Sequence, residues 1–279
     1  RDRRQRQMCI RDRYFHFPIS STGLHRLEFN VIDNYLTNYG INIDAIPHDN
    51  FQVYGEENEI SLLVKDHNNN GFFDQQDYIE FYAEKNNGWL DSLVYDSSRY
   101  LPDEYYSLFN DTIRYYFSWN NNGNNKRTVI ETDTNFSNYS SINYCWRNEI
   151  LKFNSNYLIG NQQSGLSSPK YDVGEGWAGM RLSKNGSNIE QLNSLNSYNN
   201  GPNSFGRINL MSSNSSAVNF NGKNHNTKLF VNNNLIIDTN YAYYQVLHVN
   251  YELPSSTIFS VTDFKPVSYT HLTLPTISC

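Results

Sequence analysis

Cysteine and long apolar runs are both scarce in this chain, and each shortage excludes a class of structure. Only three of the 279 residues are cysteine, and two of them, Cys9 and Cys279, lie in the terminal stretches 1–13 and 267–279. The remaining Cys145 provides no disulfide framework. No apolar run approaches the roughly 20 residues that a membrane-spanning helix needs, so we predict no membrane span.

Basic residues are outnumbered as well, with 22 Lys and Arg against 28 Asp and Glu. Residues 1–13 hold six Arg and two Asp, and residues 267–279 hold no Lys, Arg, Asp or Glu. The stretch between them therefore keeps 16 basic and 26 acidic side chains, which is a formal net charge of −10. Because nucleic-acid binding normally needs a cationic surface, we predict no nucleic-acid partner.

The two ends of the chain are related to each other through their codons. Residues 8–12 can be encoded by ATG TGT ATA AGA GAC, and the reverse complement, extended by two bases, encodes residues 267–271. The same relation links residues 3–7 to residues 272–276. This pattern is typical of a translated sequencing adaptor. The sequence therefore predicts that residues 1–13 and 267–279 are non-native and that the native stretch is about 14–266.

Aromatic residues and asparagine are plentiful, whereas alanine is rare. The chain has 22 Tyr and 16 Phe, and its asparagines gather in short polar tracts between apolar segments. This composition favours strands joined by Asx-rich turns over helices. One hairpin is predicted over residues 228–238, with apolar arms around Asn232-Asn233-Asn234, and a second polar tip at 120–125 predicts a strand over 128–132.

The predicted fold is all-β, with two β-sandwich or barrel-like domains and at most one short helix. That helix would span Asn30 to Gly40, with Ile32, Leu36 and Tyr39 on one face. Ser, Gly and Pro accumulate between residues 162 and 176, which suggests a domain boundary. We therefore predict an N-terminal β domain over residues 14–165 and a β-sandwich over residues 166–266.

The most informative stretch is residues 66–77, a polar loop between the apolar runs 60–64 and 78–82. Carboxylate or amide side chains stand at loop positions 1, 3, 5, 9 and 12, and Gly71 stands at position 6, where the chain must bend. This is the ligand order of a calcium loop of EF-hand type, here between predicted strands. The predicted Ca²⁺ ligands are Asp66, Asn68, Asn70, the Phe72 carbonyl, Asp74 and Asp77. The alternative is a metal-free, Asx-rich hairpin tip.

Cys145 is the one internal candidate for a nucleophile. No His lies near it in the sequence, and no Gly-rich turn surrounds it. A Cys between two aromatic residues is more often a small core residue, and we predict that for Cys145. The histidines lack the spacing of a zinc site. No catalytic residue is predicted, so the chain as it stands is not expected to be an enzyme.

Four tryptophans support an alternative function. On a sandwich, exposed Trp side chains form flat platforms that stack against sugar rings, as in carbohydrate-binding modules of secreted bacterial enzymes. The candidates are Trp89, Trp119, Trp146 and Trp177. The competing interpretation is that they fill the cores of alanine-poor sandwiches.

The order of the motifs adds a resemblance to a known family. The opening is Thr22-Gly23-Leu24-His25-Arg26-Leu27, and the central segment is the Asp/Phe/Tyr-rich run 68–82. A weaker match, Val53-Tyr54-Gly55, lies between these two segments. Further weak matches come after the central segment, in this order: Trp89, residues 104–107, residues 115–117, residues 174–180 and the hairpin with His225, Asn232 or Asn233, and Asp238. Together they resemble the non-catalytic N-terminal region of gingipain-family cysteine peptidases, especially the related sortase of the type IX secretion system. Two positions depart from that pattern, His25 for a Tyr and Met180 for a Glu.

The resemblance implies an accessory region of a larger Bacteroidetes protein, secreted, periplasmic or on the outer-membrane surface. In that family the peptidase domain follows this region and supplies its own His and Cys. The implied partners are that downstream domain and components of type IX secretion. The implied work is to assist folding, inhibition or positioning of the catalytic domain.

Overall fold

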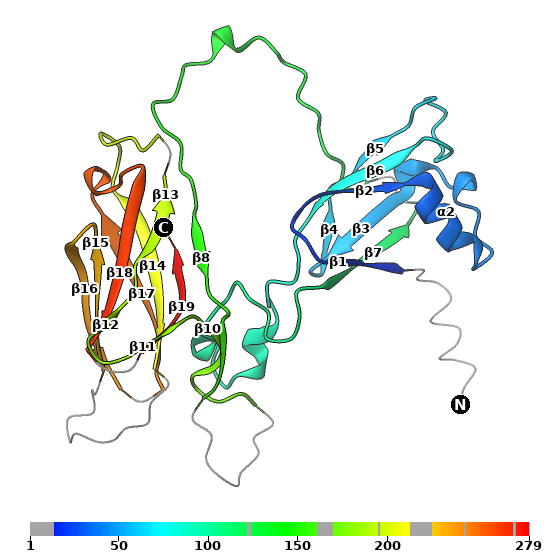
Figure 1. Cartoon of the computed structure of the whole chain (residues 1–279). Coiled ribbons are helices and arrows are strands. Elements are labelled where there is room, and N and C mark those ends of the chain that lie inside the picture. Colours follow the sequence, from blue (N-terminus) through cyan, green and yellow to red (C-terminus); the bar gives the residue numbers. More distant parts are fainter. Residues whose placement is uncertain are drawn as a thin grey trace. The chain divides into compact units, whose positions relative to one another are not determined.

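Strands dominate the computed structural model, as the sequence predicts. It describes residues 14–121, 124–160, 170–194, 196–212, 225–242, 244–269 and 272–278, the last stretch by its backbone. In this part of the chain the strands form five sheets, none closed into a barrel, beside a single α-helix (Figure 1). The all-β prediction is confirmed.

The chain divides into two compact units that differ from the predicted domains. The first unit is Arg1–Asn86 with Asn110–Asn138, and the second is Asn87–Phe109 with Tyr139–Cys279. The predicted boundary at 165/166 lies inside the second unit. Strands β8 (Ile150–Lys152) and β9 (Asn156–Ile159) pair only with strands of this unit, β19 and β10. Most of the Ser/Gly/Pro-rich stretch on which that boundary is predicted, residues 162–169, lies outside the described residues.

The first unit has two antiparallel sheets. One has the order β1 (Phe15–Ile19), β7 (Ile113–Trp119), β3 (Phe51–Gly55) and β4 (Asn58–Ile60). The other has the order β2 (Gly23–Glu28), β6 (Tyr78–Ala83) and β5 (Leu63–Lys65). Their buried side chains form one core with those of the helix. Its largest fully buried members are Phe51, Phe73, Phe81, Leu36, Ile43, Leu62 and Ile79.

The single described α-helix is α2 (Phe29–Thr37), close to the predicted range. Ile32 and Leu36 are buried as expected, and Gly40 follows the helix with φ of +69°. Tyr39 is 62% exposed instead, because it lies beyond the last helical turn. The Phe29 N–H donates to the Asp77 carbonyl (2.9 Å), so a distant loop fixes the helix start.

The strand predicted at residues 128–132 is absent from the structure. The Thr128 N–H donates to the Leu62 carbonyl (2.8 Å), and one isolated bridge joins Leu62 to Arg127. Val129 and Ile130 are then 89% and 64% exposed. A β-branched segment becomes a strand only where a neighbouring strand continues alongside it, and here the neighbour is one residue long. Figure 1 shows the long extended connection that results.

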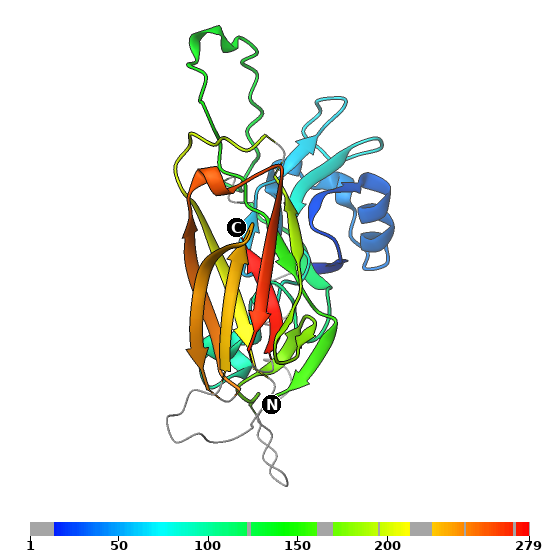
Figure 2. The same ribbon diagram turned by 60° about the vertical axis from the view of Figure 1, so that its left-hand side comes forward.

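The second unit is a β-sandwich (Figure 2). One sheet has the order β11 (Arg181–Leu182), β19 (Leu272–Ser278), β14 (Ser204–Met211) and β17 (Val246–Leu253), with β8 beside β19. The other has the order β12 (Gly186–Ser187), β18 (Val261–Ser268), β15 (His225–Val231) and β16 (Asn234–Tyr241), with β13 (Glu190–Asn193) beside β18. A separate two-stranded sheet pairs β9 with β10 (Glu175–Ala178).

The sandwich core lies between the two five-stranded sheets. Ile208, Leu210 and Leu253 come from one sheet, while Leu229 and Phe264 come from the other, and each is at most 1% exposed. The predicted hairpin is β15 with β16. Asn232 and Asn233 have φ of +46° and +67°, which suits a two-residue turn, and Asn234 begins β16.

Of the two ends predicted to be non-native, the structure describes most of the C-terminal one and none of the N-terminal one. Residues 1–13 lie outside the described residues. Residues 267 and 268 complete β18, and residues 272–278 form β19 between β14 and β8. The codon relation between the two ends is a property of the gene, so their non-native origin stays a prediction.

Candidate functional site

The polar loop of residues 66–77 connects β5 to β6, and its own side chains close it. Asn69, Gly71 and Gln76 have φ of +55°, +84° and +78°, so the chain turns sharply three times within the loop. Backbone N–H groups left free by these turns point inward, where the loop carboxylates and amides accept from them.

Asp66 accepts hydrogen bonds from two of these N–H groups. Its Oδ1 accepts from the Asn69 N–H (2.6 Å) and its Oδ2 from the Gly71 N–H (2.9 Å). His48 Nε2 lies 3.3 Å from the same Oδ2. These bonds, that of Gly71 foremost, stabilise the ionised carboxylate and lower the pKa of Asp66. Asp66 therefore stays charged at neutral pH.

Two amide side chains converge on Asp74. The Nδ2 groups of Asn68 and Asn70 donate to the same Asp74 Oδ2, over 2.8 and 2.6 Å. Their Oδ1 atoms accept from the N–H groups two residues further on, those of Asn70 and Phe72. The three side chains thus meet at one point in the loop.

Asp77 has a different environment, since it is only 1% exposed. Its Oδ1 accepts from the His67 N–H and its Oδ2 from the Asp74 N–H, both over 2.9 Å. Both carboxylate oxygens therefore hold the loop backbone. The Asp77 carbonyl adds the bond to the Phe29 N–H at the start of α2.

The predicted calcium ligands fit a metal in part. Asp66, Asn68, Asn70 and Asp74 gather in one loop, and turning the two amides by half a rotation would replace Nδ2 by Oδ1 beside Asp74. Asp66 and Asp77 both accept from backbone N–H groups, but the Asp77 side chain is fully buried while that of Asp66 is 11% exposed. Among the residues that the structure describes, no three His, Cys, Asp or Glu side chains have a metal-holding arrangement. A bound Ca²⁺ would thus rest on two carboxylates, two amides and the Phe72 carbonyl.

Contacts outside the motif hold the loop in place, and the ligand spacing does not predict them. Phe73 is fully buried, with its ring 5.3 Å from that of Phe51 and 5.8 Å from that of Phe29. The neighbouring Phe72 is 41% exposed and forms a bridge with Pro47. The pair Phe72-Phe73 directly after Gly71 is the sequence feature that could have predicted this contact. Neighbouring side chains in extended chain point to opposite sides, so one of the two rings is expected to face the core.

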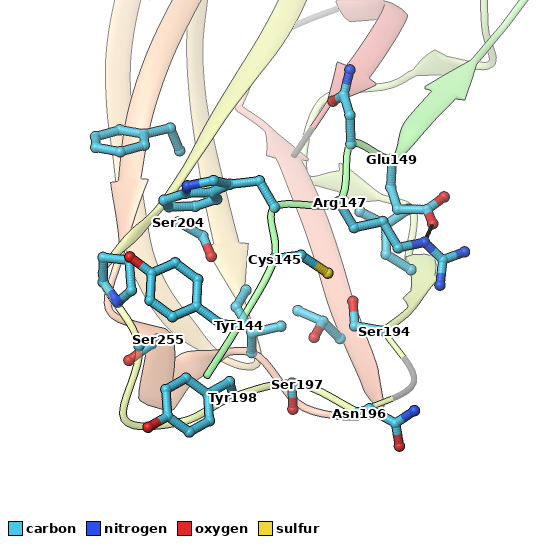
Figure 3. Close-up of a pocket in the computed structure, with 18 of the residues that line it drawn as sticks. Tyr144, Cys145, Arg147, Glu149, Ser194, Asn196, Ser197, Tyr198, Ser204 and Ser255 are labelled. Carbon is cyan, nitrogen blue, oxygen red and sulfur yellow. Dashed lines mark ion pairs between the residues drawn. The ribbon is translucent and has the colours of Figure 1, made fainter. Parts of the chain in front are cut away.

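The second candidate site is a pocket of about 830 Å³ in the sandwich unit. One wall is the extended segment 142–149, and the opposite wall comes from residues 192–205 with parts of β18 and the turn after β17. Figure 3 shows Cys145 between Tyr144 on one side and the ion pair of Arg147 with Glu149 on the other. The expectation that Cys145 is a core residue is wrong, since it is exposed on this wall. The wall has no strand partner that would bury it.

The tryptophans do not form one platform. Trp119 is half-buried in the first unit, stacked on Phe15 at 5.8 Å and packed against the core. Trp177 packs in the second unit against Tyr157, at 5.2 Å, and a small core around Tyr95. Trp89 is 36% exposed and lies outside the pocket. Trp146, 61% exposed, is the one tryptophan that lines it.

Comparisons with known proteins find a similar fold among the solved structures. No protein-family model and no curated protein matches the sequence. Among solved structures, the chain matches the crystal structure of dimeric latent PorU from Porphyromonas gingivalis with a TM-score of 0.50 and 11% identity. The fold is PorU-like. The match covers 96% of this chain and 24% of PorU, so the chain spans about a quarter of that protein's length. In the described part of the chain, no helix is long and apolar enough to cross a membrane.

Proposed function

We propose that this chain is the non-catalytic N-terminal accessory region of a type IX-associated, gingipain-like peptidase or sortase. The observation that carries the proposal is the PorU-like fold, because it extends over nearly the whole chain while covering a quarter of PorU. The order of motifs from residue 22 to residue 238 supports the same family independently of the fold. The location that goes with it is secreted, periplasmic or on the outer-membrane surface.

The proposed work of the region is to assist folding, inhibition or positioning of a catalytic domain in the same parent protein. That domain and type IX secretion components are the proposed partners. Two units built mostly of sheet, with an acidic net charge, suit a binding and scaffolding role.

A reconstitution experiment tests this role. The peptidase part of the parent gene would be produced alone and refolded with or without the present 279-residue chain added as a separate chain. We expect the added chain to change the yield of folded peptidase or its activity, and an unrelated acidic β-sandwich serves as the control. Equal yield and equal activity in all three samples would contradict the proposal.

The purified chain itself is expected to turn over no peptide substrate. Cys145 is the only Cys of the described residues, and no His lines the pocket in which it lies. Catalysis by a Cys nucleophile needs a neighbouring base, normally a His, to take up the thiol proton, and no such His lines this pocket. The measurement is hydrolysis of a fluorogenic peptide library, with Cys145→Ala as the matched control. Turnover by the chain that this variant loses would refute the prediction.

Ca²⁺ is proposed as a structural ligand of the loop 66–77. Asp66 and Asp74 supply charge, and Asn68, Asn70 and the Phe72 carbonyl supply neutral oxygens. The ion would neutralise two neighbouring carboxylates and so tighten the connection between β5 and β6. Asp77 holds the backbone whether or not the ion is bound.

A further inference from the structure

The pocket of the sandwich unit combines exposed aromatic rings with neutral polar groups. The Tyr144 and Tyr198 rings lie nearly parallel, at 13° and 6.0 Å between centroids. The Trp146 ring lies 6.1 Å from Tyr144 and 6.4 Å from Phe205. Tyr144, Trp146, Tyr198 and Phe205 are between 43% and 64% exposed. Four aromatic side chains thus leave large ring areas facing solvent in one hollow.

Side chains that donate and accept hydrogen bonds lie beside these rings. Figure 3 shows Ser194, Asn196, Ser197 and Ser204 around the same pocket. Among the hydrogen bonds of the described residues, none uses these four side chains. Ser255 is engaged, since its Oγ donates to the Asn199 carbonyl (2.8 Å). The free groups are hydroxyls and one amide, so each can either donate or accept.

The pocket carries no net charge. Its two ionic side chains are Arg147 and Glu149, and these pair with each other. A charged ligand would find no unpaired opposite charge there. A purely aliphatic ligand would cover the free hydroxyl and amide groups without giving them partners, which is unfavourable.

From this combination we infer that the pocket binds a neutral oligosaccharide. Sugar rings have apolar C–H faces that pack on the negatively polarised faces of aromatic rings, and hydroxyl edges that exchange hydrogen bonds with Ser and Asn. The volume of about 830 Å³ lies within the usual range of ligand pockets, which is roughly 300–1,000 Å³. Trp146 supplies the main stacking surface, and Tyr144 with Tyr198 supplies a second. The inference does not depend on the accessory role proposed above.

Binding is measured with the complete 279-residue chain. The probes are neutral oligosaccharides of hexoses and N-acetylhexosamines on an array, followed by calorimetry with the strongest binder. Trp146→Ala is expected to weaken binding about tenfold to a hundredfold, as loss of one stacking ring does elsewhere. Because Trp146 is 61% exposed, the variant should keep its melting temperature. Trp89→Ala, which changes a tryptophan outside the pocket in the same unit, is expected to bind normally.

Cys145 gives a second measurement at the same wall. In a chain with Cys9→Ser and Cys279→Ser, maleimide labelling reports Cys145 alone, and bound sugar is expected to slow it. Three outcomes overturn the inference: no neutral oligosaccharide binds, Trp146→Ala binds as well as the parent chain, or sugar leaves the labelling rate unchanged. A peptide library that binds through Trp146 while no sugar does would assign the pocket to peptides instead.

Discussion

Tyr115 occupies the space that a side chain at position 55 would need. A Cβ on Gly55 would lie 2.1 Å from the Tyr115 Cε1 atom, far inside van der Waals contact. The ring cannot easily move, because Tyr115 is 3% exposed and its hydroxyl accepts from the Glu84 N–H (3.0 Å). Gly55, the last residue of β3, is thus required by packing and not by backbone conformation, since it has no positive φ.

Gly55→Ala is therefore expected to lower the free energy of unfolding of the first unit by about 1–3 kcal/mol, the usual cost of overpacking. Denaturant unfolding measures it. The control is the same substitution in a Tyr115→Ala chain, where the space is open and the added methyl group should matter much less. An equal effect in both backgrounds would show that the ring is not the obstacle.

Asp77 and Asp74 belong to one motif but have separate tasks. Asp77→Ala leaves two N–H groups, those of His67 and Asp74, without their buried acceptor, and should destabilise the unit by about 1–3 kcal/mol in EGTA. Asp74→Ala removes an acceptor only from exposed amides that water can serve, so its effect in EGTA should be small. Thermal unfolding of the two variants compares them. A larger loss for Asp74→Ala would contradict this division.

At the scale of elements, local signals were predictable from the sequence and tertiary ones were not. The Asn-rich hairpin and α2 follow from turn chemistry and an apolar face, both contained in a few consecutive residues. The convergence of Asp66, Asn68, Asn70 and Asp74 in one loop follows from spacing in the same way, while Ca²⁺ binding there stays a prediction. Two predictions were wrong, a strand over residues 128–132 and burial of Cys145. Both depend on whether a strand that is distant in the sequence lies alongside, which a local pattern does not show. The spacing that makes Asp77 a predicted ligand does not reveal that both its oxygens accept from backbone N–H groups.

The loop between β5 and β6 should respond to calcium as a unit. Saturating Ca²⁺ is expected to raise the melting temperature of the first unit over EGTA, and a concentration of 100 times Kd corresponds to about 2.7 kcal/mol. Asp66→Asn should abolish the rise, because it removes one of two available carboxylates. Asp238→Asn, which changes a carboxylate paired with Lys228 in the other unit, should leave the rise intact. An equal rise in Asp66→Asn would exclude the loop as the site.

At the scale of the whole chain, the first unit is interrupted by residues 87–109, which belong to the second. The residues that flank this inserted stretch on either side are hydrogen-bonded to each other. The Asn86 N–H donates to the Asp111 carbonyl (3.1 Å), and its Nδ2 donates to the Asn110 carbonyl (2.9 Å). The two cut points are therefore neighbours in the fold.

A chain of residues 14–138 in which two glycines replace residues 87–109 is expected to fold by itself. The measurement is thermal unfolding followed by near-ultraviolet circular dichroism of the aromatic side chains. We expect a single cooperative transition. Phe73→Ala in the same shortened chain should lose that transition, because Phe73 is fully buried in the core. A shortened chain without any cooperative transition would contradict the division into two units.

The inserted stretch also sets an order of events during synthesis. Within the second unit, the Tyr95 hydroxyl donates to the Glu175 carbonyl (2.7 Å), and Asn209 Nδ2 donates to the Pro102 carbonyl (3.3 Å). Residues 87–109 leave the ribosome well before these partners, so they must wait while residues 110–138 complete the first unit. A nascent chain that has emerged from the ribosome as far as about residue 140 would thus present a finished N-terminal unit together with a loop in which Tyr95, Leu101 and Leu108 are uncovered. These side chains stay exposed to water until Tyr171 and Trp177, which pack against them in the finished unit, have been synthesised.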